Sequence, residues 1–226
     1  NSVAIPTPGD ITPGDVTTDK DFDIVVLDIA SDKVRLMEGN GDGTVATVPL
    51  GDPVGNPLPA NSDPVQLVLA DINGDSVADA ITVNESGGSL SVLLDEGDAF
   101  GTASSFVVGS LPESMAIYDF DNDGDNDLVV SFVGSASGNR ELTVIRNDTS
   151  GTVVLSEGVA VGSGSDPVMV GHGDFDRNGL EDIVSLIDLN PFDRTNSPAI
   201  SVFFNITDEV VDCPADIDGD GFVAVS

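Results

Sequence analysis

The stretch Asp-Phe-Asp-Asn-Asp-Gly-Asp-Asn-Asp-Leu-Val-Val, residues 119–130, places five aspartates at every second position and then turns apolar. Carboxylates this close repel one another, so their density requires a compensating cation or full solvation. Three interpretations compete: a solvated acidic loop, a metal site and catalytic carboxylates. The recurrence of the pattern, and the sequence that follows each copy, decide among them.

The pattern occurs in four copies, which begin 56, 48 and 55 residues apart. They are loop 1 (residues 15–23), loop 2 (71–79), loop 3 (119–127) and loop 4 (174–182). Positions one and nine are Asp in every loop, position three always carries a side-chain oxygen, and position five is Asp or Asn. A proline stands seven residues before each loop: Pro8, Pro64, Pro112 and Pro167.

Each loop is followed by strand-like segments, and no run has helical periodicity. The expected strands are residues 24–27, 80–83, 128–130 and 183–187, then 34–36, 90–94, 142–145 and 200–204, with weaker outer segments near 45–48, 105–108 and 153–155. About four strands in each repeat of roughly 50 residues predict propeller blades. A run of β-sandwich domains is the alternative, but a sandwich needs about seven strands per ~100 residues and no repeat at half that interval. The sequence therefore predicts an all-β fold: a β-propeller segment of about four four-stranded blades, part of a larger propeller.

Alternating oxygen ligands at positions one, three, five and nine allow the chain to wrap around one ion, and position seven can add its backbone carbonyl. Ca²⁺ accepts 6–8 hard oxygen ligands in flexible geometry, whereas zinc favours the nitrogen and sulfur of His and Cys, of which the chain has one each. An EF-hand is excluded for these loops, because its acidic twelfth position is absent. The predicted calcium ligands are Asp15, Thr17, Asp19, Asp21, Asp23, Asp71, Asn73, Asp75, Val77, Asp79, Asp119, Asp121, Asp123, Asp125, Asp127, Asp174, Asp176, Asn178, Leu180 and Asp182.

The four loops are not expected to bind equally. Loop 3 has five carboxylates and should bind Ca²⁺ most tightly. Loop 4 has Asn178 at position five and should bind more weakly. Loop 1, with Thr17 at position three and Lys20 where a glycine would ease the turn, is the least regular copy.

The composition supports a cation site and excludes several partners. The formal net charge is −33, with 40 acidic residues against 7 basic ones. Of the acidic residues 32 are Asp and 8 are Glu, a bias toward the residue of turns and oxygen-ligand loops that a salt-adapted surface could also contribute to. Nucleic-acid binding is excluded, because it requires clusters of Lys and Arg. No apolar run reaches the ~18 residues that a membrane span needs.

These loops, with the preceding proline and the following apolar strand, resemble the FG-GAP/VCBS repeat family, which includes the integrin α-subunit propeller. The resemblance covers about residues 8–211. It implies that each calcium loop connects the first two strands of a blade and stabilises the blade rather than catalysing a reaction. The chain departs from the family in that only Phe100-Gly101 matches its "FG" element and no Gly-Ala-Pro triplet is present.

The last stretch, residues 213–226, breaks the repeat because it lacks the proline seven residues upstream. It resembles the first calcium loop of a dockerin-type EF-hand module, which implies a cohesin-like partner; a degenerate fifth repeat is the alternative. The predicted domains are a propeller segment at residues 1–211 and a truncated dockerin-like loop at 212–226. The candidate ligands in this loop are Asp216, Asp218 and Asp220.

The sequence offers no catalytic motif of the G-x-S-x-G, P-loop or H-E-x-x-H type. His172 abuts loop 4, where a turn or supporting role is expected. We therefore expect a non-enzymatic, calcium-binding module of a secreted or cell-surface protein, with a structural, adhesion or ligand-binding role and a protein or glycan ligand. The alternative is the propeller portion of a secreted polysaccharide-degrading enzyme, with its catalytic residues elsewhere.

Overall fold

The computed structural model describes residues 7–17, 19–46, 55–59, 62–97, 99–133, 140–147, 159–163, 167–187, 199–205 and 222–225. The chain divides into two compact units. Unit 1 comprises Asn1–Leu111 with Thr149–Thr152, and unit 2 comprises Pro112–Asp148 with Val153–Ser226. All regular structure in the described residues is β-strand, as the sequence predicts. The described residues contain no helix that could cross a membrane.

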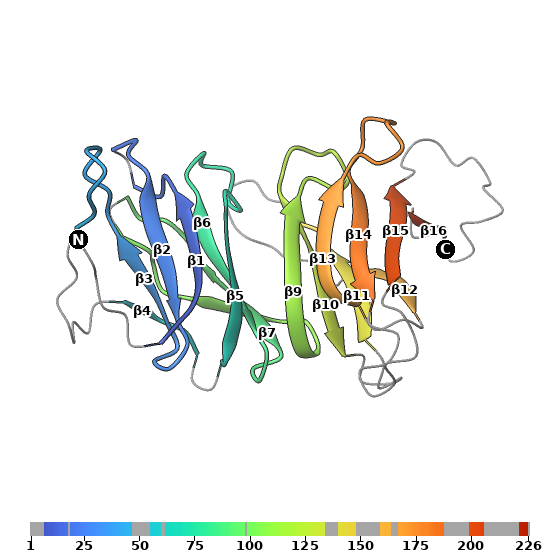
Figure 1. Cartoon of the computed structure of the whole chain (residues 1–226), viewed down its shortest axis with the longest axis horizontal. Helices are drawn as coiled ribbons and strands as arrows, with labels where there is room; N and C mark the ends of the chain where they lie inside the picture. The colour runs from blue at the N-terminus through green and yellow to red at the C-terminus, as the bar shows by residue number, and fades with distance from the viewer. Residues whose placement is uncertain are drawn as a thin grey trace. The chain divides into compact units, whose positions relative to one another are not determined.

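Unit 1 contains two four-stranded antiparallel sheets, each with its strands in chain order (Figure 1). The first sheet consists of β1 (Pro8–Gly14), β2 (Asp23–Asp28), β3 (Lys33–Met37) and β4 (Asn56–Pro57). The second consists of β5 (Pro64–Ala70), β6 (Asp79–Asn84), β7 (Ser89–Leu93) and β8 (Ser104–Val107).

Unit 2 repeats this arrangement with two further four-stranded sheets. One consists of β9 (Ser110–Tyr118), β10 (Asp127–Val133), β11 (Arg140–Ile145) and β12 (Val159–Ser163). The other consists of β13 (Pro167–Gly173), β14 (Asp182–Ile187), β15 (Ala199–Asn205) and β16 (Phe222–Val225). The prediction of four four-stranded units is confirmed.

Each Asp-rich loop connects the first two strands of its sheet, and its ninth residue is the first residue of the second strand. The prolines upstream lie in the first strands: Pro8, Pro64 and Pro167 begin β1, β5 and β13, and Pro112 lies within β9. In β1, β5 and β13 the register with the second strand shifts directly after the proline. Proline has no N–H to donate to the ladder, so it is tolerated where the pairing begins irregularly.

The apolar segments after the loops pack the two sheets of each unit together. In unit 1, Val25 and Leu27 of β2 share a buried cluster with Leu67, Ala80 and Leu93 of the second sheet. The central strands β6 and β7 are buried along their whole length, which explains why their sequences are nearly continuously apolar or small. Loops 1 and 2 extend from these packed strands, so the core fixes where each loop begins and ends.

In unit 2, Val129 and Leu142 share a second buried cluster with Ile183 and Phe203. Phe120, the second residue of loop 3, belongs to the same cluster. The core of unit 2 therefore extends into one of the Asp-rich loops.

The outer strands differ most from the sequence-based expectation. In the first sheet the fourth strand is Asn56–Pro57; of the expected strand near 45–48, Val45 forms an isolated bridge to Gly39, and residues 47–48 lie outside the described part of the chain. The alternation of apolar residues near 45–48 was too short to distinguish a strand from a loop. Residues 153–155 lie outside the described part of the chain, and the outer strand of the third sheet is Val159–Ser163. The expected strand near 105–108 is confirmed as β8.

The C-terminal prediction is only partly covered. Asp216, Asp218 and Asp220 lie outside the described residues, so the dockerin-like loop stays a prediction. Phe222–Val225, at the end of that segment, pair with β15 as the fourth strand of their sheet.

Candidate metal centre

The ninth position of every loop is a buried Asp that joins two backbone segments. In each case Oδ2 accepts a hydrogen bond from the N–H of the second loop residue, and Oδ1 accepts one from a residue at or just beyond the end of the third strand. The first set of bonds comes from Val16, Ile72, Phe120 and Phe175, with N···O distances of 3.0, 3.0, 3.0 and 2.8 Å. The second set comes from Gly39, Asp95, Asn147 and Asn205, with N···O distances of 2.9, 2.7, 2.8 and 2.8 Å.

All four of these aspartates, Asp23, Asp79, Asp127 and Asp182, have 0% of their surface exposed. Burial raises the pKa of Asp79 and of Asp127 to about 6, although the two backbone hydrogen bonds on each act in the opposite direction. The sequence predicts these side chains as metal ligands. The structure shows that they also connect the loop to the end of the third strand, as a brace. The sequence did not reveal this role, because the residue at the far end of the brace lies 16 to 23 positions away.

The first position organises the turn of the loop. In loop 3, Asp119 accepts hydrogen bonds from the backbone N–H of Asp123 and of Gly124, both at 3.0 Å. In loop 4, Asp174 does the same for Asn178 and Gly179, both at 3.1 Å. Asp71 likewise accepts from the N–H groups at positions five and six of loop 2. These carboxylates therefore hold the turn of the backbone in loops 2, 3 and 4.

The fifth and sixth positions repeat in all four loops. The side-chain oxygen at position five accepts a hydrogen bond from the N–H at position seven, at 2.7 to 3.0 Å. The residue at position six has positive φ in every copy: Lys20, Ser76, Gly124 and Gly179. Because a left-handed backbone favours glycine, this confirms that a glycine would ease the turn where Lys20 stands. The residues at position seven, Asp21, Val77, Asp125 and Leu180, use their N–H in this bond, and the ligand role of their carbonyls stays a prediction.

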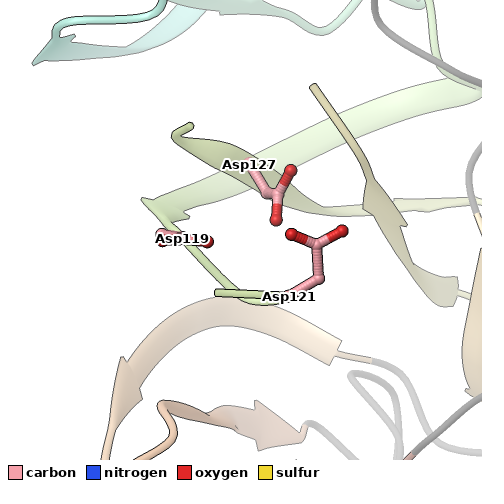
Figure 2. A group of neighbouring side chains, drawn as sticks. All are labelled: Asp119, Asp121 and Asp127. Carbon is pink, nitrogen blue, oxygen red and sulfur yellow. The ribbon is translucent and has the colours of Figure 1, made fainter. Parts of the chain in front are cut away.

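The acidic side chains converge in unit 2. One carboxylate oxygen from each of Asp119, Asp121 and Asp127 lies within 4.8 Å of the others, and the same is true of Asp174, Asp176 and Asp182. Figure 2 shows the carboxylates of Asp121 and Asp127 pointing toward each other at loop 3. Among the described residues, groups of three converging carboxylates occur only at these two loops.

Asp121 carries the clearest sign that loop 3 fits a cation. Its Oδ1 is buried and receives no hydrogen bond. Burial and the neighbouring carboxylate of Asp123 raise its pKa, while Arg146, whose Nε lies 3.7 Å from Oδ2, lowers it. A buried carboxylate oxygen without a donor is costly unless a cation or a proton compensates it. The donor set is all oxygen, so loops 3 and 4 could hold a hard metal ion.

Loops 1 and 2 are built differently at position three. Thr17 donates its hydroxyl hydrogen to Asp19 Oδ1 at 2.9 Å, and the amide of Asn73 donates to Asp75 Oδ2 at 2.9 Å. The predicted ligand pairs Thr17 with Asp19 and Asn73 with Asp75 do lie together. They are joined by hydrogen bonds, which already provide the carboxylates of Asp19 and Asp75 with a donor.

Two asparagines near the loops were not singled out as site residues from the sequence. Asn147 and Asn205 are fully buried, and each donates its backbone N–H to the ninth-position Asp of its own sheet. Their side chains donate to loop carbonyls as well. Both sheets of unit 2 have an Asn near the end of their third strand, and this repeat could have identified the two residues. It is hard to recognise because Asn147 lies 20 residues after Asp127 and Asn205 lies 23 residues after Asp182.

His172 lies in β13, outside the converging carboxylates. Its Nδ1 is 2.9 Å from Glu181 Oε2, and its ring centroid is 5.0 Å from that of Tyr118. These contacts agree with the supporting role expected beside loop 4.

Comparison with solved structures identifies the fold. The structure of BBS1N, solved in complex with ARL6DN, aligns with a TM-score of 0.53 and 13% identity over 89% of this chain and 54% of the other. A crystal structure described as a putative 6-phosphogluconolactonase from Bacteroides fragilis aligns with a TM-score of 0.55 and 15% identity over 87% of this chain and 50% of the other. The chain therefore spans about half the length of these solved structures. At such low identity the likeness supports the fold alone, and it agrees with the predicted β-propeller architecture.

Sequence comparison places the chain in a family. No curated protein sequence matches it. A family model described as an FG-GAP-like repeat matches residues 15–82 and 119–185. These two stretches make up more than half of the chain and include all four Asp-rich loops. This chain of Asp-rich blades belongs to the FG-GAP-like repeat family.

Proposed function

We propose that this β-propeller segment is a calcium-binding module in which Ca²⁺ holds the loop ends of the blades together. The observation that carries the proposal is the convergence of Asp119, Asp121 and Asp127 at a loop where Oδ1 of Asp121 is buried and has no hydrogen-bond donor. The net charge of −33 and membership of the FG-GAP-like repeat family support it. Calcium is preferred over zinc because the ligand atoms are oxygens, and over magnesium because Mg²⁺ demands a near-ideal octahedron whereas Ca²⁺ accepts flexible geometry.

In loop 3 the ion would be held by Asp119, Asp121, Asp123 and Asp127. In loop 4 it would be held by Asp174, Asp176, Asn178 and Asp182. A bound Ca²⁺ supplies the positive charge that offsets the repulsion among these carboxylates. The chain supplies the positions, because the backbone hydrogen bonds to the first, fifth and ninth residues hold the oxygens together.

The module is proposed to act outside the cell or at its surface, in adhesion or ligand binding, with no catalytic step of its own. Extracellular calcium modules commonly bind at about 10⁻⁴–10⁻³ M, which suits loops with few rigid ligands. The ligand is proposed to be a protein or a glycan. Binding of the intact chain to glycan arrays and to cell surfaces, with and without Ca²⁺, tests this part separately.

The calcium proposal is tested by thermal unfolding followed by circular dichroism in excess EGTA, in millimolar Ca²⁺ and in millimolar Mg²⁺. Binding to the native state at a hundredfold excess over Kd adds about 2.7 kcal/mol per site, so two or more sites raise the Tm by many degrees. The control is the double variant Asp121→Asn/Asp176→Asn, which keeps the loop size and removes one carboxylate from each convergent group. A wild-type Tm that is the same in EGTA and in Ca²⁺ would sink the proposal.

A further inference from the structure

Asn205, the last residue of β15, contacts both Asp-rich loops of unit 2. It is fully buried, and hydrogen bonds join its backbone and its side chain to residues of loop 3 and of loop 4. Loop 3 belongs to the sheet β9–β12 and loop 4 to the sheet β13–β16, so this one residue bridges two sheets.

Two of the bonds to loop 4 involve its ligand positions, and a third runs from Asn205 Nδ2 to the carbonyl of Glu181, the eighth position, at 3.3 Å. The N–H of Asn205 donates to Asp182 Oδ1 at 2.8 Å, which is the ninth position. Its carbonyl oxygen accepts a hydrogen from Asn178 Nδ2 at 2.8 Å, which is the fifth position. An Asp at position five could not donate this bond, so the departure from Asp at Asn178 has a structural purpose. Whatever orders Asp182 and Asn178 therefore fixes the backbone of Asn205 on both sides.

The bond to loop 3 leaves from the side chain of the same residue. Asn205 Nδ2 donates to the carbonyl oxygen of Phe120 at 2.6 Å. Phe120 is the second residue of loop 3, between the ligand candidates Asp119 and Asp121, and its N–H donates to Asp127 Oδ2 at 3.0 Å. A continuous path of hydrogen bonds thus runs from Asp127 through Phe120 and Asn205 to Asp182.

The residues at the equivalent places of the other sheets make different bonds. Asn147 donates its backbone N–H to Asp127 and its amide to the carbonyl of Asn126 at 3.2 Å, so these two bonds stay within its own sheet and loop. Asp95 occupies the place in unit 1, and its carboxylate accepts hydrogen bonds from the N–H of Gly97. A carboxylate cannot donate to a carbonyl, so the side chain of Asp95 cannot make the bond that Asn205 Nδ2 makes, and Gly39, at the equivalent place of the first sheet, has no side chain.

We propose that Asn205 couples the two loops of unit 2, so that a divalent cation bound at loop 4 raises the affinity of loop 3 and the reverse. This inference rests on the proposed calcium function and adds a regulation of it. An ion in loop 4 orders Asp182 and Asn178, which holds Asn205 in the position where its amide meets Phe120. The ordering of loop 3 then costs less when its own ion binds. Linkage requires the effect to be the same in both directions.

The test is a Ca²⁺ titration of the whole chain followed by ¹H–¹⁵N NMR, with the amides of Gly124 and Gly179 as separate reporters of the two loops. Each of these N–H groups donates to the first-position Asp of its own loop. The titration is done on the wild type and on a variant with loop 4 weakened (Asp174→Asn/Asp176→Asn). It is then repeated on both of these proteins with Asn205→Ala added. We expect weakening of loop 4 to raise the Ca²⁺ midpoint at Gly124 by roughly five-fold, and addition of Asn205→Ala to abolish this dependence.

Three comparisons separate the bridge from other effects. Weakening loop 3 with Asp119→Asn/Asp121→Asn should raise the midpoint at Gly179 by the same factor. Asn147→Ala removes a buried asparagine whose amide donates to the carbonyl of Asn126 in loop 3, so it should leave the dependence in place. Asn205→Asp keeps the size of the side chain and removes the donor, so it replaces Asn205→Ala if that variant does not fold.

The outcomes distinguish this inference from the function beneath it. Calcium shifts at both reporters that do not depend on the other loop, or a dependence that survives in both Asn205 variants, overturn the coupling and leave calcium binding intact. No calcium response at either reporter overturns both proposals.

Discussion

The loops of the two units share a backbone conformation and differ in which groups compensate their carboxylates. In unit 1 the third position is Thr17 or Asn73, and each donates a hydrogen bond to the carboxylate at position five. In unit 2 the third position is Asp121 or Asp176, which can only accept, and three carboxylates converge at each loop. The braces from position nine are the same in all four loops.

This difference shows that the residues that fix the loop conformation are not the residue at position three, on which we expect the dependence on a bound cation to rest. Positions five and nine accept hydrogen bonds from the backbone in all four loops, position one does so in loops 2, 3 and 4, and position six has positive φ in every copy. Position three is a hydrogen donor in unit 1 and an acceptor carboxylate in unit 2. In loop 4 the amide of Asn178 donates to Asp176 at 3.3 Å, whereas in loop 3 Oδ1 of Asp121 is buried and accepts no hydrogen bond. We therefore expect unit 2 to depend on calcium more than unit 1, although the same fold carries both.

The largest expected effect comes from removing a brace, which should affect both units equally. Asp127→Ala and Asp23→Ala each leave two backbone N–H groups without their charged acceptor, and we expect each to cost about 3–5 kcal/mol of unfolding free energy in EGTA. Urea unfolding followed by circular dichroism measures this. The control Val107→Ala, at a residue 89% exposed, should change the free energy by less than about 0.5 kcal/mol. A loss confined to Asp127 would show that the braces are not equivalent.

The second effect is a dependence on pH that both units share in the absence of metal. The pKa of Asp79 in unit 1 and of Asp127 in unit 2 is raised by burial to about 6, above the value of 3.8 that an exposed Asp has. A raised pKa means that the folded state favours the protonated form, so this contribution is present at pH 4 and is lost as the pH rises through 6. The metal-free chain should therefore become more stable as the pH falls from 7 to 5, by on the order of 1 kcal/mol for each carboxyl over this interval.

Urea unfolding in EGTA at several pH values measures this dependence. Calcium should reverse it, because protons compete with the ion for the same oxygens, so that the calcium-bound chain loses stability over the same interval. Stability in EGTA that falls from pH 7 to pH 5 would contradict the assignment of buried, proton-accepting carboxyls.

The third prediction exchanges position three between the units. Asp121→Asn removes one converging carboxylate from loop 3, and we expect it to weaken calcium binding by at least ten-fold and to raise metal-free stability by about 1 kcal/mol. Asn73→Asp makes the opposite change in loop 2 and should do the reverse. Calorimetric calcium titration and urea unfolding in EGTA measure the two quantities. If both variants moved stability in the same direction, position three would not be the residue that separates the loops.

The smallest expected effect concerns position six. Lys20→Gly places a glycine at φ 69° in loop 1, and we expect it to stabilise the metal-free chain by about 0.5–1 kcal/mol. Gly124→Ala in loop 3 should cost about 1 kcal/mol or more, because φ is 101° there while a Cβ would meet no atom within 4 Å. The unfolding midpoint in urea reports both. A Gly124→Ala variant as stable as the wild type would show that the turn relaxes rather than holds its shape.

The sequence alone predicted the features that repeat locally. The Asp-rich loops, the strands on either side of them and the four-sheet arrangement follow from residues that lie close together in the chain. The two-residue strand Asn56–Pro57 was not predicted, because its assignment depends on pairing with β3 rather than on its own pattern. In the same way, the braces of Asp23 and Asp127 depend on partners a whole strand pair away.

The site itself was predicted in composition but not in detail. Asp119, Asp121 and Asp127 were named as ligands, and they do converge. Asn178 was predicted as a calcium ligand that weakens loop 4, but no local signal shows that its amide bonds to the carbonyl of Asn205. Long-range hydrogen bonds of this kind require the packing of two sheets, which the sequence encodes only through the whole core.

The burial of Asn147 and Asn205 has a practical consequence for glycosylation. Each begins an Asn-X-Thr tripeptide, the acceptor pattern for N-linked glycans, and a glycan would attach to the nitrogen that donates to Asn126 or to Phe120. Neither side chain is exposed in the folded chain, so an oligosaccharide could be added only before folding and would then occupy the place of a packed loop. A host that glycosylates secreted proteins would thus divert this chain from its fold, whereas a host without that machinery would not.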